Sequence, residues 1–441
     1  MDSHETDTRW TILWLLVLIS VVRSMDAVNF SVAAKQIMPE YGLSHVQMGL
    51  LYTSFTLGYA LFHVPGGWLG DTFGPRRVLT AAVLWWSVFT ALTALAGQGW
   101  LAALFGPVGS FMVVRFCIGM GESAGYPTAN RAIASWMAPN ERARAVGLLL
   151  AGMGIGYGLA PPIVSWIMIH RGWRAAFYVF GLLGIALAAW WYAYATDAPE
   201  EHPRVSAAEL RRIRSAGPVE KRPTPWRAIL THRDVLLLTL AMFGYGYGGY
   251  VFQSWFYLYL VDVRGFSVLQ AGWLTAAPFV AITIFGPLGG ALSDALGKRY
   301  GITVGRRAVA MSGFVLAALC LYTGALVADG HAAVFLLALA AGSLYFGGAA
   351  MVAACIDIGG PHSGTIYGVT VTLFQLAGVV APTLTPIVAE RFGWTAALQL
   401  AALVALGTAG LWLLINPANR IEAAEDFSRQ RRRGADIQCS K

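Results

Sequence analysis

Long apolar segments follow one another along almost the whole chain, separated by short polar loops. A helix that crosses a bilayer needs about 20 mostly apolar residues, because it rises 1.5 Å per residue through a hydrocarbon core about 30 Å thick. Windows of that length predict twelve spans, near 10–33, 46–69, 78–98, 103–128, 144–169, 173–195, 235–260, 267–292, 307–328, 332–355, 365–389 and 394–415. The pattern therefore predicts an all-α membrane protein with twelve transmembrane helices.

One long polar segment interrupts this series between the sixth and seventh spans. Within it, the stretch SAAELRRIR is typical of a short amphipathic helix that lies at a membrane surface. The segment divides the spans into six and six. We therefore expect an N-terminal half at 1–196, a cytoplasmic linker at 197–232, a C-terminal half at 233–416 and a tail at 417–441.

Composition and charge agree with a membrane protein and exclude other classes. Only 12% of the 441 residues are charged, whereas a soluble protein is about a quarter charged. Most of the 31 Lys and Arg residues lie in the termini and the even-numbered loops. Because basic loops stay on the cytoplasmic side, this distribution predicts that both termini lie on the cytoplasmic side of a plasma membrane. The basic residues then serve as topological anchors, so we expect no nucleic-acid partner. The four cysteines are scattered without a metal-ligand spacing, and we expect no metal and no cofactor.

Four ionisable residues fall inside the predicted spans of the first half. Arg115 and Glu122 are seven residues apart, and Arg23 and Asp26 are three apart, so each pair shares one helix face. Ionisable groups in hydrocarbon are costly and usually mark a substrate or proton pathway. An anion that neutralised an arginine would let a neighbouring carboxyl group take up a proton, which would couple the two cargoes. The alternative is a buried ion-pair network that only holds helices together.

A second pattern occurs once in each half, about half the chain apart. Gly-Gly-Trp-Leu-Gly-Asp-Thr-Phe-Gly-Pro-Arg-Arg follows the second span, and Gly-Gly-Ala-Leu-Ser-Asp-Ala-Leu-Gly-Lys-Arg follows the eighth. Such a duplication is typical of transporters built from two related halves. We expect the glycines to allow close helix contact, and the aspartate to cap the following helix and engage the nearby arginines as a latch. The candidate gating residues are Gly67, Asp71, Gly74, Arg76, Arg77, Asp294 and Arg306.

These loops resemble the cytoplasmic signature of the major facilitator superfamily. The stretch RFCIGMGESAGYPTANRAIASWMAPNERARAVG is similar to the fourth and fifth helices of its anion:cation symporter branch, as are YALFHVPGGWLGD and SGTIYG elsewhere. That branch includes bacterial sugar-acid symporters. The resemblance implies that Asp26 and Glu122 are proton sites and that Arg115 takes part in substrate binding and coupling. It also implies a transporter. The sequence has no nucleophile–base pair and no metal-ligand spacing, so we do not expect an enzyme, and we expect a monomer.

The first span departs from the family pattern in one respect. The family typically has arginine directly after the aspartate, where this chain has Ala27, while Arg23 lies one turn earlier. At 100° per residue, Arg23 lies about 60° from Asp26 around the helix, compared with about 100° for the family's arginine. We therefore hypothesise that Arg23 replaces that arginine from one turn away.

Further candidates for substrate contact lie in the second and seventh spans. Tyr59 matches a family tyrosine, and His63 lies one turn further on the same face, where packing alone is an equal explanation. In the seventh span, Tyr247, Tyr250 and Gln253 offer rings and an amide suited to a small-molecule cavity. Ordinary helix packing would explain about half of this aromatic segment.

Two further positions bear on the kind of anion. Gln375 falls where sugar-acid members carry an asparagine, and it can offer a similar amide. Met153 stands near a position where they carry a glutamine, and methionine cannot bond hydroxyl groups in the same way. This substitution favours a less polar carboxylate, aromatic or short-chain, over a richly hydroxylated sugar acid.

The sequence thus predicts proton-coupled uptake of a small organic anion, either a sugar acid or another carboxylate, across a bacterial inner membrane. Two alternatives remain. A proton-driven exporter commonly has a Gly-Pro motif in its fifth span, which Gly-Leu-Ala-Pro-Pro at 158–162 matches only in part. A transport-inactive membrane sensor would not need titratable groups in its spans.

Overall fold

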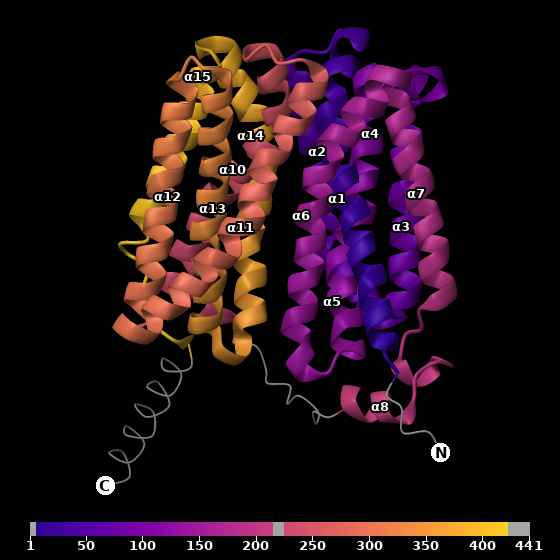
Figure 1. The fold of residues 1–441 in the computed structure, drawn as a ribbon, viewed down its shortest axis with the longest axis vertical. Helices are drawn as coiled ribbons and strands as arrows, with labels where there is room; N and C mark the ends of the chain where they lie inside the picture. Colours follow the sequence, from indigo (N-terminus) through magenta and orange to yellow (C-terminus); the bar gives the residue numbers. More distant parts are fainter. Residues whose placement is uncertain (1–5, 215–224, 422–441) are drawn as a thin grey trace. The chain divides into compact units, whose positions relative to one another are not determined.

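The computed structural model describes residues 6–214 and 225–421, and every regular element in these ranges is helical (Figure 1). Twelve of the described helices have 18 or more residues. They are α1 (Thr8–Tyr41), α2 (His45–Phe73), α3 (Pro75–Thr93), α4 (Gly99–Ser123), α6 (Pro139–Arg171), α7 (Trp173–Tyr194), α10 (Arg233–Leu258), α11 (Val268–Tyr300), α12 (Ile302–Leu326), α13 (Gly330–Gly359), α14 (Ser363–Phe392) and α15 (Trp394–Leu411). The twelve-helix prediction is confirmed.

Shorter elements join these helices. They are α5 (Gly125–Trp136), η1 (Pro199–Glu201), α8 (Ala207–Ile213), α9 (Trp226–Thr231), η2 (Tyr259–Val263) and η3 (Gly360–His362). The span predicted at 103–128 is two helices, because the chain breaks at Ala124 between α4 and α5. The amphipathic helix predicted in the linker is α8.

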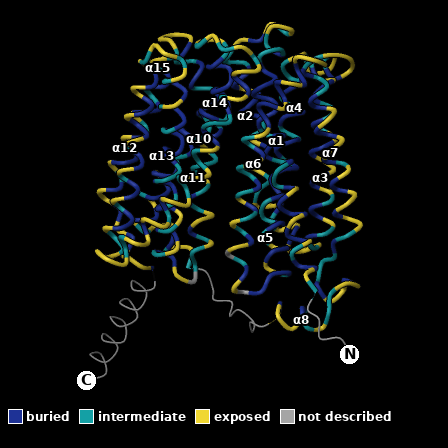
Figure 2. Tube along the Cα trace, viewed as in Figure 1, coloured by how far each residue is buried: buried dark blue, intermediate teal, exposed yellow. Residues whose placement is uncertain are grey.

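The helices are suited to a lipid environment. In the described part of the chain, ten helical segments are both long and apolar enough to cross a membrane, whereas α2 and α3 are long but less apolar. Exposed and buried positions alternate along each helix (Figure 2). Many exposed positions carry large apolar side chains, such as Leu182 at 66% exposure and Leu403 at 66%. In water such surfaces would aggregate, and in a bilayer they contact acyl chains.

The described residues form two compact units. Unit 1 contains α1 to α8 together with Val251–Val280 and Val379–Trp394, which are the adjoining ends of α10, α11 and α14. Unit 2 contains α9, α12, α13, most of α15 and the remaining parts of α10, α11 and α14.

Within unit 1, the helices pair closely as α1 with α6, α2 with α4, and α3 with α7. The α2–α4 pair depends on glycine. A Cβ atom on Gly58 would lie 2.2 Å from the carbonyl oxygen of Phe116, and one on Gly119 would lie 2.0 Å from that of Phe55. No larger residue fits there, and the close approach brings the aromatic face of α2 against α4.

The parts of α10, η2 and α14 that belong to unit 1 are tied to each other and to α1 and α2 by polar contacts. The Thr53 hydroxyl donates to the carbonyl of Val379 at 2.7 Å, and the Trp255 ring N–H donates to the carbonyl of Pro382 at 3.0 Å. Lys35 of α1 forms an ion pair with Asp262. Unit 1 is therefore more than the first six spans.

The two repeated signatures differ in structure. In unit 2, the Arg306 guanidinium donates to Asp357 at 2.7 Å and to Ser293 at 2.9 Å, and it also pairs with Asp294. The predicted contact between Asp294 and Arg306 is present. In unit 1, Asp71 is exposed and lies 3.6 Å from Arg131 instead of Arg76 or Arg77.

The expectation that these aspartates cap the following helices was wrong. Asp71 lies inside α2 and Asp294 inside α11, because both helices continue past the aspartate. The turn after α2 is made by Gly74, whose φ of +84° suits glycine. The backbone N–H of Arg76 donates to Asp197 at 2.8 Å, so a more distant residue supplies the contact expected from Asp71.

Candidate anion and proton site

Four charged side chains from two helices of unit 1 are buried near one another. Asp26 and Arg115 are 4% and 3% exposed and Glu122 is 1% exposed, while the side chain of Arg23 is 13% exposed. Arg23 and Asp26 come from α1, and Arg115 and Glu122 from α4. The structure thus brings together the four residues that the sequence singles out.

Arg23 is the nearest counter-charge to Glu122. Its Nε atom lies 3.8 Å from Oε2 of Glu122, and its guanidinium lies 5.7 Å from the ring centre of Tyr59. The His63 ring packs against Tyr59 with ring centres 5.3 Å apart and an interplanar angle of 32°. This geometry is compatible with the hypothesis that Arg23 replaces the family's arginine, since it reaches the acid on α4.

Arg115 is held by aromatic rings. Its guanidinium lies 4.5 Å from the ring centres of both Phe30 on α1 and Phe55 on α2. Among the described residues, no carboxylate forms an ion pair with it within 4 Å, and its Nε has no hydrogen-bond partner. Stacked aromatic faces stabilise a cation without neutralising its charge. Arg115 is therefore a buried positive charge without a close ion-pair partner in the described part of the chain, although Glu122 and Asp26 interact with it at longer range.

Several buried polar groups around Asp26 also lack protein partners in the described part of the chain. In the described part of the chain, neither carboxylate oxygen of Asp26 has a hydrogen-bond partner, and the same holds for the side chains of Asn29 on α1 and Thr90 on α3. Asp26 interacts electrostatically with Glu122 and Arg115, and Thr90 lies nearby. Because buried polar groups are almost always hydrogen-bonded, this cluster is suited to bind water, a proton or a polar ligand.

A third group of residues in unit 1 surrounds Tyr157 of α6. The Gln253 amide donates to the Tyr157 hydroxyl at 3.3 Å, and the Tyr157 ring stacks on Phe279 at 5.3 Å with an interplanar angle of 19°. Tyr157 interacts electrostatically with Arg23 and Glu122. The sequence analysis did not select Tyr157, although it lies four residues after Met153 and so on the same helix face.

The remaining candidates lie in unit 2. The Tyr250 hydroxyl donates to Oε1 of Gln375 at 3.0 Å, and the Tyr250 ring contacts Phe374 at 5.6 Å. Tyr247 is 1% exposed, with its ring 6.5 Å from that of Phe243. The amide of Gln375 is thus placed beside aromatic rings in this unit.

In the described part of the chain, twelve long helices, ten segments of which are apolar enough to cross a membrane, and a group of buried charges in unit 1 are typical of a membrane transporter. Comparison with known families agrees. The Major Facilitator Superfamily model matches residues 16–304 and 267–433, which is nearly the whole chain. The protein belongs to the major facilitator superfamily. It is a multi-pass membrane transporter and not an enzyme.

Several relatives are named as transporters of organic anions. The chain is 35% identical over 396 residues to a probable sulfoacetate transporter of Cupriavidus necator, covering 89% of this chain and 90% of that one. It is 31% identical to the hexuronate transporter of Bacillus subtilis, covering 87% of this chain and 88% of that one. It is also 31% identical to a probable galactarate/D-glucarate transporter of Escherichia coli, with 86% and 87% covered. The resemblance to the anion symporter branch is confirmed.

A solved structure supports the fold. A bacterial homologue of the human lysosomal transporter Spinster, in an inward-facing and occupied conformation, superposes with a TM-score of 0.76. The match covers 95% of this chain and 99% of that one at 19% sequence identity. At this identity the likeness extends to the fold alone.

Proposed function

We propose that the protein takes up a small organic anion together with protons, with Arg115 binding the anion and with Asp26 and Glu122 carrying the protons. One observation carries this proposal. Arg115 is buried and stacked between two aromatic rings, and among the described residues no carboxylate neutralises it within 4 Å. A buried cation without a close counter-ion is costly, so the site gains most by binding an anion.

The charge balance of the four residues supports coupling to protons. Arg23 and Arg115 balance Asp26 and Glu122 when no ligand is bound. An anion that engages the arginines adds negative charge in a medium of low dielectric constant, and a carboxyl group can then relieve the repulsion by binding a proton. Anion and proton would bind together for this reason, and each would leave when the other leaves.

The surrounding side chains support an anion with few hydroxyl groups. Met153 and the stacked rings of Tyr157 and Phe279 offer apolar surface, with the amide of Gln253 beside them. The probable sulfoacetate transporter is named for a short anion of this kind, and it is 35% identical to this chain. We therefore propose a short carboxylate or sulfonate as the substrate, and a hydroxylated hexuronate or galactarate as a weaker one.

The bacterial relatives and the distribution of basic residues support a place in a bacterial inner membrane with both termini in the cytoplasm. In that orientation, uptake is movement from the side of the odd-numbered loops toward the side of the linker.

The test is uptake by purified protein in liposomes with an imposed pH gradient, using sulfoacetate, galactarate, glucuronate and benzoate. We expect sulfoacetate to accumulate when the outside is acidic, and glucuronate and galactarate to be taken up more slowly. Extrusion of the anion toward the acidic side would identify a proton-driven exporter. Binding of an anion without any flux would identify a sensor.

A further inference from the structure

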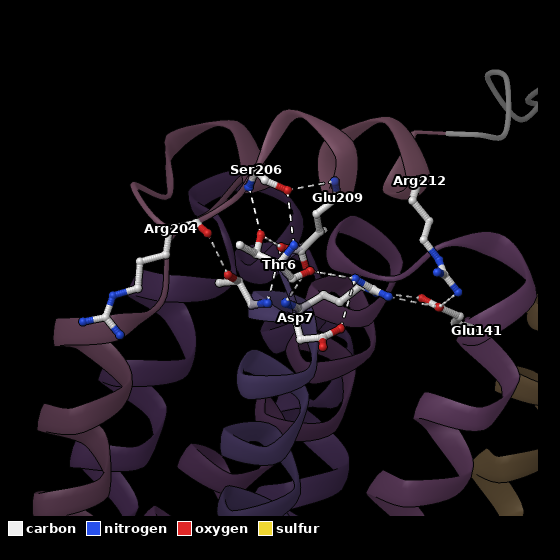
Figure 3. A network of polar contacts seen from close by, with 9 residues as sticks. Thr6, Asp7, Glu141, Arg204, Ser206, Glu209 and Arg212 are labelled. Carbon is white, nitrogen blue, oxygen red and sulfur yellow. Dashed lines mark hydrogen bonds and ion pairs between the residues drawn. The ribbon is translucent and has the colours of Figure 1, made fainter. Parts of the chain in front are cut away.

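The linker helix α8 is joined to the start of α1 by a cluster of buried polar contacts (Figure 3). Glu209 of α8 is completely buried, and Arg9 of α1 is 2% exposed. Arg9 donates to Glu209 at 3.1 Å and to Glu141 of α6 at 3.1 Å, and Arg212 of α8 pairs with Glu141 at 2.8 Å. We call Arg9, Glu141, Glu209 and Arg212 the linker cluster. The exposed Asp7 carboxylate also lies 3.8 Å from Arg9.

Glu209 also accepts hydrogen bonds from backbone N–H groups at the start of α1. The first residues of a helix expose backbone N–H groups that need an acceptor, and this is usually the side chain of the N-cap residue. The N-cap residue here is Asp7, whose side chain makes no such bond. Instead, the Glu209 carboxylate accepts the backbone N–H of Thr8 at 3.3 Å and that of Arg9 at 2.9 Å. A residue 200 positions away therefore caps α1, and its negative charge also suits a helix N-terminus.

The segment before α1 strengthens this junction. Thr6 and Ser206 exchange two hydrogen bonds: the N–H of Thr6 donates to the Ser206 hydroxyl at 3.2 Å, and the N–H of Ser206 donates to the Thr6 hydroxyl oxygen at 2.9 Å. The Thr6 hydroxyl in turn donates to Glu209 at 2.6 Å. Figure 3 shows Thr6, Ser206 and Glu209 converging at this point.

A helix as short as α8 is not stable alone in water, since helices under about 12 residues rarely form without tertiary contacts. Its seven residues are held by the linker cluster and by Ile213, which is 4% exposed. Helix and junction therefore form together. The contacts join α8 both to α1, which carries Arg23 and Asp26, and to α6, which carries Tyr157.

We propose that Glu209 is a positioning residue for transport: it caps α1 from the linker and fixes α8 to the first six-helix half, so that α8 moves with α1 and α6 throughout the transport cycle. The polar segment between the halves is then not a passive tether along its whole length. The inference requires that the protein carries an anion, but it does not require protons to drive it.

A disulfide across the junction tests whether α8 stays in place. Thr6→Cys and Ser206→Cys are combined in a chain whose native cysteines are replaced, namely Cys117, Cys320, Cys355 and Cys439. Transport is measured as counterflow without a pH gradient, using whichever of sulfoacetate, galactarate, glucuronate and benzoate the wild type carries fastest. We expect oxidation to link the two cysteines almost completely and to leave the counterflow rate within about twofold. Loss of counterflow on oxidation that reverses on reduction would overturn the proposal, because α8 would then have to leave the first half.

Substitutions separate the cap from the ion pair. Glu209→Ala should lower the maximal counterflow rate about tenfold, the scale of a lost helix cap on a conformational step. The half-saturation concentration should stay the same, because Arg9 precedes Arg23 by about four turns, or roughly 21 Å. Glu209→Gln should retain part of the rate, since an amide oxygen still accepts N–H groups. The exchange Arg9→Glu with Glu209→Arg should not restore it, because arginine cannot accept a hydrogen bond.

Glu200→Ala is the matched control, since Glu200 lies in the same linker but is half-exposed and, among the described residues, forms its ion pair with Arg214. It should leave the rate unchanged. If Glu209→Ala behaves like Glu200→Ala, the positioning role is refuted. Full rescue by the exchanged pair would refute the capping role as well. If the wild type carries none of the four anions, the proposed substrate class fails, while disulfide formation still reports whether α8 is fixed to α1.

Discussion

Replacing Arg23 with alanine removes the counter-charge nearest to Glu122. The two charges are 3.8 Å apart, so their attraction is about 4 kcal/mol at an effective dielectric constant of about 20. If one third of that energy, about 1.4 kcal/mol, is added to the barrier of the transport step, the transport rate falls about tenfold. We therefore expect Arg23→Ala to reduce pH-driven accumulation in proteoliposomes at least tenfold, with weaker dependence on external pH.

A second substitution makes this test specific to Arg23. The double variant Arg23→Ala with Ala27→Arg moves the positive charge to position 27, where the family usually has arginine. It should restore part of the accumulation. Arg171→Ala, at the exposed end of α6, is the control and should behave as wild type. If Arg23→Ala keeps full accumulation and an unchanged pH profile, Arg23 holds no role in coupling and the hypothesis is wrong.

Four further predictions follow from the same geometry. Glu122→Gln should abolish proton-driven accumulation in liposomes while leaving some anion exchange, and loss of exchange in folded protein would give Glu122 a wider role. Gly119→Ala places a Cβ atom 2.0 Å from a backbone oxygen and should lower thermal stability by several degrees, unlike Gly147→Ala, which meets nothing within 4 Å; equal melting temperatures would contradict the close α2–α4 contact. Burial lowers the pKa of the His202 imidazole below its ordinary 6.5, so the folded state favours the neutral ring. The unfolding temperature should therefore fall as the pH drops below about 6.5, because the unfolded chain then binds the proton more readily. His202→Gln should weaken this pH dependence, and an unchanged profile would show that other groups cause it. Met153→Gln should raise the competition of galactarate and glucuronate for uptake, and no change would remove Met153 from the determinants of specificity.

Much of the fold could be predicted because the bilayer requires apolar helices, and this requirement gives a simple pattern of hydrophobic residues in the sequence. Spans of about 20 apolar residues are required by the bilayer, so their number follows from windows of hydrophobicity. The ends of the helices were predicted less accurately than their number. The break at Ala124 follows from Pro127, which cannot donate to the carbonyl of Ser123, but the prediction kept that proline inside one span. In addition, α11 runs on to Tyr300 through a segment that a bilayer would not require to be helical.

The central site was predictable for a related reason. Charges in hydrocarbon are rare enough that Arg23, Asp26, Arg115 and Glu122 stand out by type and spacing alone. The aromatic rings around Arg115 did not stand out, because Phe30 and Phe55 look like ordinary lipid-facing or core residues in a membrane helix. Only the fold shows that both lie against the same guanidinium.

Contacts between distant segments were beyond the sequence. The local repeat suggested that Asp71 would meet Arg76, yet Asp197, more than 120 residues further along, accepts from its backbone. The capping of α1 by Glu209 is of the same kind, since a glutamate in a polar linker gives no sign of where it folds. Local pattern predicts helices well, and it predicts their polar partners poorly.

The most direct test of the central claim is accumulation of labelled sulfoacetate by proteoliposomes containing wild-type protein or the double variant Asp26→Asn with Glu122→Gln. With an acidic exterior, the wild type should accumulate the anion and carry protons inward with it, as recorded by a pH-sensitive dye inside the vesicles. The double variant should do neither. Accumulation by the double variant equal to that of the wild type, with the same proton influx, would contradict the account, since the protons would then be carried by other groups.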